Sequence, residues 1–521
     1  MARMFLSAGA MLCLSSALTP VAAAKTVVTL NITQTVESID PAKITDYTDY
    51  LAAVNLYDGL THVDPSGHVI PRLATAWDIS PDGLKITFHL KPDAKFQDGS
   101  PVTAKDVAYS VKRLMSIDRG PSALLAGVLK PDGVVAANDH TAVFTLEHSF
   151  SPFIAITPLL LVVNSKEAEA HTKDGDWAQA WLGDHISSGG PYSIQQWDHG
   201  GGMTLVRFEG YEGRWPAHPI DELHFPLTND EATVLAMAAS GQLTMASEFQ
   251  TNETYETLAK MPRMKLQVDA SPDAFYLKMN SKSAPTDDVH VRRAIACAVD
   301  YQTIQQQILA GEPLSGPLPS SFKQFHLGSL KAPAQDLDCA KAELAQSKYA
   351  SAGPVKVTLT YVGGLKFEED VGLLMQSTLN GLGFELTLDP EPWNRITQIA
   401  SKVETTPALS EVFFEATYPS PDSMFYTQYH SKAQGTWASM EWLGDPSIDK
   451  MILDARSTYD EKRQAEIYGE LQAKLVDMQA DAFLMVKTKR TVMDKCLNGF
   501  HLLPMQSFGW DFSKMSYDCP T

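Results

Sequence analysis

The stretch WDISPDGLKITFHLKPDAKFQDGSPVTAKDV, residues 77–107, decides the fold class because it contains a complete hairpin followed by a helix start. Asp82-Gly83 lies between two apolar runs, and residues 84–91 alternate between apolar and polar types. Period-two alternation beside such a turn predicts a β-hairpin. Residues 103–106 (TAKD) then match a variant of the capping box and predict the start of a helix.

The rest of the chain extends this pattern into two lobes. A second hairpin is predicted over residues 134–146, with its turn at Asn138-Asp139. From residue 355 onward, strands alternate with helices, which is typical of a second α/β lobe. We therefore predict an α/β protein in which residues from about 71 to 185 form a small separate lobe.

The first 24 residues are typical of a secretory signal peptide. Arg3 supplies a positive start, residues 5–18 form a short apolar run, and Ala22-Ala23-Ala24 offers small residues for cleavage before Lys25. The run is too short for a membrane span. We predict export to the periplasm with cleavage near Ala24; a buried N-terminal helix is the alternative.

The cysteines fit an exported chain. Cleavage would remove Cys13 and leave four cysteines: Cys297, Cys339, Cys496 and Cys519. An even number favours disulfide bonds, and four cysteines allow three pairings. We predict the local pairs Cys297–Cys339 and Cys496–Cys519. None of these cysteines has the CxxC spacing of a zinc site, and we expect neither a metal nor a cofactor.

The chain is acidic, and this limits its partners. It has 62 Asp and Glu residues against 42 Lys and Arg residues, which gives a formal net charge of −20. Such a balance argues against nucleic acid and against an anionic membrane surface as partners. It permits a cationic ligand without requiring one.

The sequence offers no catalytic motif. We find no GxSxG, no HExxH, no P-loop and no paired-glycine dinucleotide turn. Carboxylate pairs such as Glu368-Glu369 are interpreted as surface charges of a helix. We expect a binding protein and not an enzyme, although a glycosidase with two distant carboxylates is compatible with the sequence.

Several short motifs occur in an order that is known from one family. They are Asp40-Pro41, Leu56-Tyr57-Asp58-Gly59-Leu60, Leu73-Ala74-Thr75-Ala76-Trp77, Phe96-Gln97-Asp98-Gly99, Gly189-Gly190-Pro191-Tyr192, Val291-Arg292-Arg293-Ala294 and Pro419-Ser420-Pro421-Asp422. Together with the quoted stretch they resemble the family 5 extracellular solute-binding proteins, the peptide, dipeptide and nickel receptors of ABC importers. The resemblance covers essentially the whole chain after residue 24.

The resemblance implies a periplasmic-binding-protein type II fold, a Venus-flytrap with two lobes, a hinge and an extra small domain. Domain I would combine residues 25–70, 190–285 and 490–521, domain II would be 71–189, and domain III would be 286–489. It also implies a monomer that captures a small-molecule ligand without covalent chemistry. The closed form would dock on the transmembrane permease of an ABC transporter.

The resemblance also assigns candidate ligand contacts before residue 413. Thr35 and Glu37 match a loop that lines the cleft, although Glu37 also suits a plain surface charge. Trp393 matches an aromatic cleft wall, with a core tryptophan as the alternative. Arg395 is suited to binding a carboxylate, with a surface salt bridge as the alternative.

The segment FFEATYPSP, residues 413–421, is the most informative part of the candidate site and includes Phe414. In peptide receptors of the family, an Asp four residues before the final Pro holds the peptide's α-ammonium. Here that position is Thr417, a neutral hydroxyl, and a buried ammonium without its carboxylate is costly. Glu415 replaces the missing Asp only if the strand stays regular.

The predicted ligand is therefore a polar, non-standard small molecule: an opine-like sugar–amino acid conjugate, an oligosaccharide or a modified peptide. Tyr276, Trp393, Tyr418 and Trp437 would supply stacking surfaces for sugar rings. An ordinary di- or oligopeptide receptor is the main alternative. An exported hydrolase and a chaperone-like or signalling role are further alternatives. Nickel is disfavoured because no compact group of histidines stands out.

Overall fold

The structure is a computed structural model that describes residues 25–213, 215–269, 271, 273–351, 353–503, 505 and 508–519. The predicted signal peptide, residues 1–24, lies outside the described residues. Among the residues that are described, no helix is both long and apolar enough to cross a membrane.

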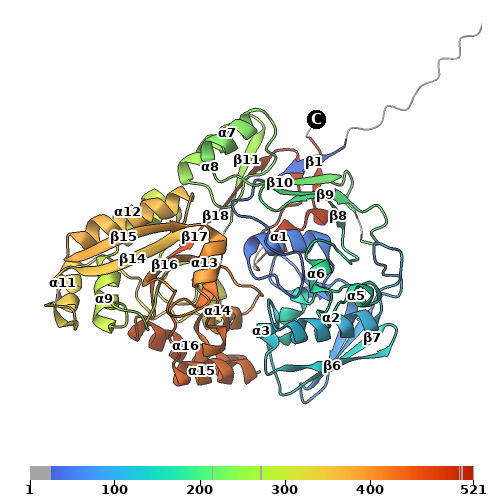
Figure 1. The fold of residues 1–521 in the computed structure, drawn as a ribbon, viewed down its shortest axis with the longest axis horizontal. Coiled ribbons are helices and arrows are strands. Elements are labelled where there is room, and N and C mark those ends of the chain that lie inside the picture. Colours follow the sequence, from blue (N-terminus) through green and yellow to red (C-terminus); the bar gives the residue numbers. More distant parts are fainter. Residues whose placement is uncertain are drawn as a thin grey trace, which may run out of the picture.

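The quoted stretch forms half of a small antiparallel sheet in the order β4-β5-β7-β6. Its strands are β4 (Ala74–Ile79), β5 (Lys85–Leu90), β6 (Leu129–Asn138) and β7 (Thr141–Leu146). In β5 the apolar residues Ile86, Phe88 and Leu90 are buried, as the alternation predicts. Helix α2 (Ala104–Ile117) begins with a capping box between Thr103 and Asp106 and packs on this sheet. Both predicted hairpins and the predicted helix start are confirmed (Figure 1).

A second sheet contains the first strand of the described chain. Its order is β1-β10-β9-β8, with β1 (Val27–Thr29), β10 (Glu222–Pro226), β9 (Gly202–Arg207) and β8 (Tyr192–Asp198). Helix α1 (Tyr47–Leu56) lies close to it, and every residue of α1 is buried. Most of its residues are apolar, which suits this buried position, and its polar residues Thr48, Asp49 and Asn55 are buried with them.

Short elements connect these two sheets. They are β2 (Thr61–Val63), β3 (Val69–Pro71), α3 (Ser122–Leu125), α4 (Phe153–Ile156), α5 (Ser165–His171) and α6 (Gln179–Leu182). One continuous hydrophobic core runs beneath both sheets.

The larger lobe is built on a six-stranded mixed sheet in the order β13-β17-β12-β16-β14-β15. The strands are β12 (Ala274–Met279), β13 (Gly311–Glu312), β14 (Val355–Val362), β15 (Phe384–Glu391), β16 (Leu409–Phe414) and β17 (Asp481–Lys487). Its helices are α9 (Val289–Ala298), α10 (Tyr301–Thr303), α11 (Leu337–Gln346), α12 (Lys366–Asn380), α13 (Trp393–Ile399), α14 (Pro421–Tyr429), α15 (Pro446–Ser457) and α16 (Glu461–Asp477). This lobe has a hydrophobic core of its own, so the predicted second α/β lobe is confirmed.

Two neighbouring chain segments lead from one lobe to the other. Strand β11 (Met264–Asp269) pairs with β18 (Lys489–Asp494) and precedes β12, whereas β18 follows β17 after the single residue Thr488. The backbone N–H of Lys487 donates to the carbonyl of Asp273 at 2.8 Å and joins the two segments. Helices α7 (Glu231–Ala239) and α8 (Asn252–Ala259) lie beside this crossing (Figure 1).

Strand β12 bears on the expected domain boundaries. Residues 274–279 fall in the range expected for domain I, yet β12 is hydrogen-bonded to β16 and β17 of the larger sheet. The larger lobe therefore starts at this strand, before residue 286. The reason is the crossing itself, because β11 and β12 follow each other closely but belong to different sheets. The other boundaries stay a prediction.

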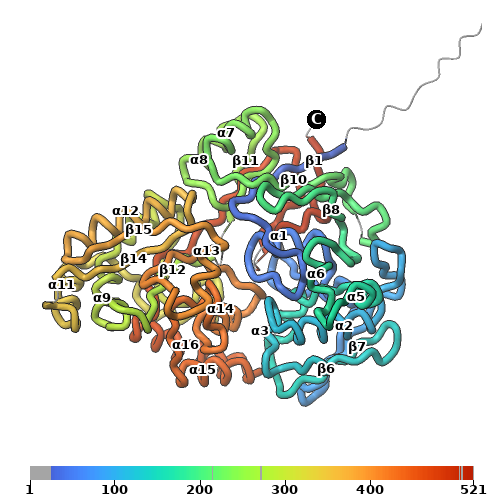
Figure 2. The backbone as a smooth tube through the Cα atoms, in the orientation of Figure 1, coloured from blue at the N-terminus to red at the C-terminus, as the bar shows by residue number. Residues whose placement is uncertain are grey.

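Both predicted disulfide pairs are present. Cys297–Cys339 links α9 to α11, and Cys496–Cys519 ties the last described residue to the start of β19 (Leu497–Asn498), which pairs with β20 (Ser516–Tyr517). The C-terminal segment returns to the first lobe, where its red trace lies beside the blue N-terminal segment (Figure 2). There the side-chain amide of Asn55 donates to the carbonyl of Trp510 at 2.9 Å.

Candidate ligand-binding site

A cavity lies where the two lobes meet, and we call it the central cavity. The first lobe contributes Thr33, Gln34, Asp46, Tyr47, Glu248 and Phe249 to its lining. The larger lobe and the crossing contribute Asp273, Val362, Leu365, Glu368, Trp393, Glu411, Val412, Phe413, Glu415 and Trp437. Aromatic and acidic side chains thus dominate the lining, and both lobes supply them.

The start of α1 carries the first lobe's contribution. Asp46 is the N-cap of this helix, and its carboxylate accepts hydrogen bonds from the backbone N–H groups of Thr48 and Asp49 at 3.0 and 3.1 Å. Burial raises the pKa of Asp46, against the opposing effect of these hydrogen bonds. The cap fixes the carboxylate at the cavity wall, where Tyr47 packs edge-on against Phe249.

Trp393 connects the two lobes across the cavity. Its indole Nε1 donates to Oδ2 of Asp46 at 3.2 Å, and its ring meets that of Trp437 edge-on at 5.2 Å. Trp393 is the first residue of α13 and is half-buried; it lines the central cavity and also packs against the core of the larger lobe. The two tryptophans proposed from sequence are therefore neighbours in the same wall.

A second cavity, with about 950 Å³ of space between atoms, continues on the other side of Trp437, and we call it the side cavity. Its lining consists of Ile44, Thr45, Tyr50, Gly120, Pro121, Ala123, Leu124, Thr397, Phe414, Thr417, Tyr426, Thr427, Lys432, Ala433, Gly435, Thr436, Trp437 and Ala438. Phe414 and Thr417, both sequence candidates, lie here. Hydroxyl and aromatic groups prevail, and Lys432 is the single charged residue in this lining.

Two buried carboxyl groups in the lining of the central cavity interact electrostatically. Glu411 on β16 and Glu368 on α12 are each 2% exposed. Burial raises the pKa of Glu368 to about 8, although its carboxylate accepts a hydrogen bond from the backbone N–H of Val362 at 2.6 Å. Burial and the nearby charge of Glu368 raise the pKa of Glu411 well above its ordinary value. The interpretation of the pair Glu368-Glu369 as surface charges is wrong for Glu368, which lies on the covered face of α12, and right for Glu369, which is exposed.

The crossing places two lysines beneath the cavity. Lys489 forms ion pairs with Glu248 and, at 3.3 Å, with Glu415, and burial lowers its pKa to about 7. Lys487 donates to the backbone carbonyl of Glu248 at 2.5 Å. Glu415 therefore lines the cavity as a member of a buried ion pair, and the ammonium of Lys489 is the cation that it binds.

Other sequence candidates lie away from the cavities described above. Tyr276 and Tyr418 are fully buried, and their hydroxyls donate to the carbonyl of Pro317 at 2.9 Å and to Asp422 at 2.6 Å. Both are packed in hydrophobic cores, because each belongs to a segment that is covered on both faces.

The polar candidates at the surface also find local partners. Thr35 donates to Glu37 at 2.6 Å, and the neighbouring residues Thr33 and Gln34 line the central cavity instead. Arg395 is exposed and donates to the side-chain oxygen of Gln398 at 2.7 Å. Their roles in ligand binding stay predictions.

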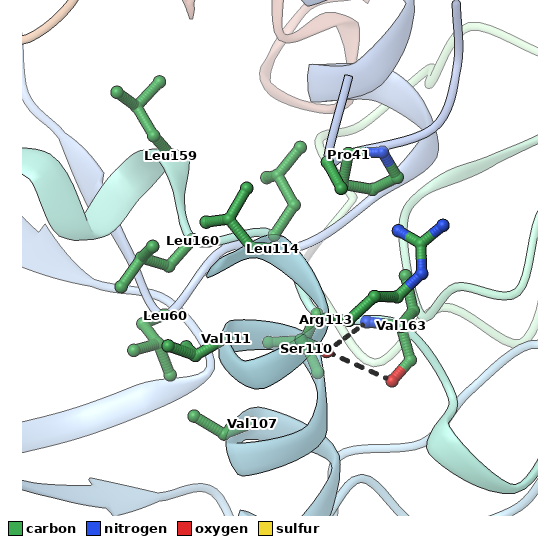
Figure 3. Close-up of a pocket in the computed structure, with 13 residues that line it drawn as sticks. Pro41, Leu60, Val107, Ser110, Val111, Arg113, Leu114, Leu159, Leu160 and Val163 are labelled. Carbon is green, nitrogen blue, oxygen red and sulfur yellow. Dashed lines mark hydrogen bonds between the residues drawn. The ribbon is translucent and has the colours of Figure 1, made fainter. Parts of the chain in front are cut away.

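A cavity inside the smaller sheet's lobe offers no polar chemistry. It lies between α2 and residues 159–163 and is lined mainly by leucine and valine side chains (Figure 3). Figure 3 shows the guanidinium of Arg113 pointing away from these leucines; it forms a bidentate ion pair with Asp40 at 2.6 and 2.7 Å. Among the residues that the structure describes, no group of three or more potential ligands is arranged to hold a metal ion.

Two lobes, a double crossing between them and a cavity lined from both sides define a solute-binding protein. The family model of the bacterial extracellular solute-binding proteins, family 5, matches residues 68–436, and the chain belongs to this family. The family resemblance and the periplasmic-binding-protein type II fold expected from sequence are confirmed.

Relatives of the chain bind several kinds of solute. The probable D,D-dipeptide-binding periplasmic protein DdpA of Escherichia coli is 25% identical over 489 residues, which cover 92% of either chain. The periplasmic binding protein DppA of Helicobacter pylori, solved with the peptide STSA, has a TM-score of 0.85 at 20% identity and covers 95% of this chain and 98% of its own. AgaA of A. tumefacien, solved with agropinic acid, has a TM-score of 0.82 at 20% identity and covers 95% and 99%.

Proposed function

We propose that this chain is the periplasmic substrate-binding protein of an ABC importer, which captures a polar small solute between its lobes and delivers it to the permease. The observation that carries the proposal is the central cavity, because its lining combines side chains of both lobes. A ligand that contacts both lobes favours the closed state over the open state. Capture and release need no covalent step, so the protein works as a receptor and not as an enzyme.

The solute is an opine-like sugar–amino acid conjugate, an oligosaccharide or a modified peptide. Trp393 and Trp437 supply flat surfaces suited to sugar rings, and the side cavity adds hydroxyl groups, among them that of Thr417. A structurally similar protein was solved with agropinic acid, which supports this class of solute. An ordinary peptide receptor is the alternative, supported by the relative solved with the peptide STSA.

The delivery step follows from the crossing of the chain. Bending where the two crossing segments meet, at Asp273 and at residues 487–489, would move one lobe against the other with little change inside either core. We infer that the protein is exported as a monomer, loses residues 1–24 by cleavage near Ala24, and presents its closed form to the permease.

A thermal-shift screen tests this function. Purified protein lacking residues 1–24 is heated separately with opine-like conjugates, oligosaccharides, modified peptides and ordinary peptides. After each run the compound is recovered and its mass is measured. A ligand at 100 times its Kd should stabilise the protein by about 2.7 kcal/mol and return chemically unchanged. Conversion of a bound compound would favour the exported hydrolase instead, and a protein that binds a sensor partner but no small solute would favour a signalling role.

A further inference from the structure

The carboxylate of Glu411 lines the central cavity without a hydrogen-bond partner, in the part of the chain that the structure describes, that would explain its burial. It is 2% exposed, it lines the cavity, and neither of its oxygens has a hydrogen-bond partner among the described residues. A buried carboxylate without a donor loses its hydration and gains nothing in return, at a cost of several kcal/mol. Such a group is retained where a ligand supplies the missing donors.

Glu368 adds a second carboxylate to the same part of the wall. One of its oxygens accepts the hydrogen bond from the backbone of Val362, and its charge is felt by Glu411. In all, six lining residues are acidic and none is Lys or Arg: Asp46, Glu248, Asp273, Glu368, Glu411 and Glu415. The lining is thus strongly acidic around Glu411.

The lysines beneath the cavity do not supply the missing donors. Lys489 is engaged by Glu248 and Glu415, and Lys487 donates to the backbone carbonyl of Glu248. No hydrogen bond or ion pair among the described residues joins either lysine to Glu411. The charge of Lys487 acts on Glu368 and lowers its pKa against the effect of burial, but Glu411 keeps two oxygens without a donor in the described part of the chain.

Aromatic rings complete the surroundings of a cation. Tyr47, Phe249, Phe413, Trp393 and Trp437 line the same cavity as Glu411. The face of an aromatic ring attracts a desolvated cation, and the attraction is worth about 2 kcal/mol in buried sites. The rings of Phe249 and Phe413 already face the ammonium of Lys487 at 5.2 and 5.3 Å, so the indole rings of Trp393 and Trp437 are the aromatic surfaces offered to a ligand. Carboxyl groups and these rings together favour a positively charged organic group.

We propose that the central cavity binds the cationic end of its ligand, an ammonium or guanidinium group, between Glu368 and Glu411, while the uncharged remainder extends past Trp437 into the side cavity. This inference rests on the proposed function and specifies its substrate class. Peptide receptors of the family hold an ammonium with an Asp at the position of Thr417, which this chain lacks. Here the cation is held by Glu368 and Glu411 instead.

The test uses matched pairs of compounds and matched variants. Each amine or guanidinium compound of the screen is paired with its acetylated or urea counterpart, for example tri-alanine with N-acetyl-tri-alanine, glucosamine oligomers with N-acetylglucosamine oligomers, and arginine conjugates with citrulline conjugates. Binding is measured by calorimetry on the unaltered protein, on Glu411→Gln and on Glu368→Gln. Glu369→Gln, a half-exposed neighbour on the same helix, removes the same charge away from the cavity and is the control.

We expect hits among the cationic members only, with affinity about 10- to 100-fold weaker in Glu411→Gln and in Glu368→Gln and unchanged in Glu369→Gln. The empty Glu411→Gln protein should melt at the same or a higher temperature, because the buried carboxyl group that it replaces has no hydrogen-bond partner among the described residues; this separates lost binding from lost folding. Equal binding of neutral partners, with Glu411→Gln unaffected, would overturn the cation site and leave the proposed function standing. A panel without any hit would contradict both.

Discussion

Trp393 shows how much of this site depends on a single side chain. It donates to Asp46 of the other lobe and meets Trp437 edge-on, so one indole contributes a polar contact across the cavity and a ring surface within it. Buried aromatic residues at the centre of a contact surface commonly dominate its binding energy. The candidate was found from sequence, but its partner Asp46 was not, because an acidic N-cap is explained equally well by its helix.

Replacing Trp393 by alanine is expected to weaken ligand binding by about 2 kcal/mol or more, roughly a 30-fold loss in affinity, with a correspondingly smaller thermal shift. The protein should stay folded, since the side chain is only half-buried. Calorimetry measures the affinity and circular dichroism the fold. An unchanged ligand response in a folded variant would remove Trp393 from the cavity wall.

Asp40 and Arg113 form a second instructive pair at the residue scale. Their side chains are 0% and 2% exposed, and Arg113 also donates to the carbonyl of Trp177 at 2.7 Å. We expect Asp40→Asn to lower the free energy of unfolding by about 3 kcal/mol, because an unpaired buried guanidinium remains. Urea unfolding measures the loss. Lys112→Met on the same helix breaks the exposed pair with Asp132 and should cost less than about 1 kcal/mol.

Strand β16 shows at the element scale what a sequence reveals and what it leaves hidden. Glu411 and Phe413 share one face of β16, and Glu415 follows directly after the strand. Charged side chains in and beside a strand usually indicate a face exposed to water. Here β16 is an inner strand of the six-stranded sheet, and both Glu411 and Glu415 are buried. That burial depends on residues far away in the chain, and for this reason the acidic wall was missed.

The hairpins and the helix start were predictable because their signals are local. Asp82-Gly83 allows a tight turn, and Thr103 with Asp106 satisfies the first backbone N–H groups of α2 within four residues. The place of Trp393 in the cavity lining followed from the family resemblance. Glu415 was considered as a substitute for the carboxylate missing at Thr417, and Trp437 was chosen as an aromatic stacking surface. Tyr276 and Tyr418 were placed near the ligand by residue type alone, and residue type does not distinguish a cavity wall from a core.

Helices α9 and α11 carry the element-scale prediction. The Cys297–Cys339 bond joins them across a separation of 42 residues. Replacing both cysteines by alanine is expected to lower the free energy of unfolding by about 4 kcal/mol, through the larger entropy of the unfolded chain. Urea unfolding of the double variant, compared with unaltered protein, measures this. A loss of less than about 1 kcal/mol would show that the packing of α9 on α11 suffices.

At the scale of the whole molecule, charged groups fasten the C-terminal segment to the first lobe. Asp511 is paired with Arg72 at 3.5 Å and with His62 at 3.3 Å, and Arg72 also donates to Asp58 at 2.7 Å. Burial alone would raise the pKa of Asp511, but Arg72 and His62 outweigh it and hold this pKa well below its ordinary value. The segment is therefore anchored by an ionised carboxylate.

The anchor should make stability depend on pH. Because the pKa of Asp511 is lower in the folded chain than in the unfolded one, its contribution is complete above about pH 5 and is lost as the pH falls through about 4 toward the folded-state pKa. We expect Asp511→Asn to lower the free energy of unfolding by about 2 kcal/mol at pH 7 and to flatten its decline below pH 5. Urea unfolding from pH 3 to 7 measures both. Parallel curves for the variant and the unaltered protein would contradict the anchor.

The double crossing between the lobes also has a consequence for biosynthesis. Strand β18 and the residues around Trp510 complete the lobe that begins with β1, so its core contains both the earliest and the latest described parts of the polypeptide. The first lobe is therefore not a continuous stretch of chain, whereas the larger lobe is contained within residues 274–487. A nascent chain emerging from a ribosome or a translocation channel therefore stays incomplete until almost its last residue has arrived, and premature termination only a few dozen residues early would leave an unsealed core exposed to proteases.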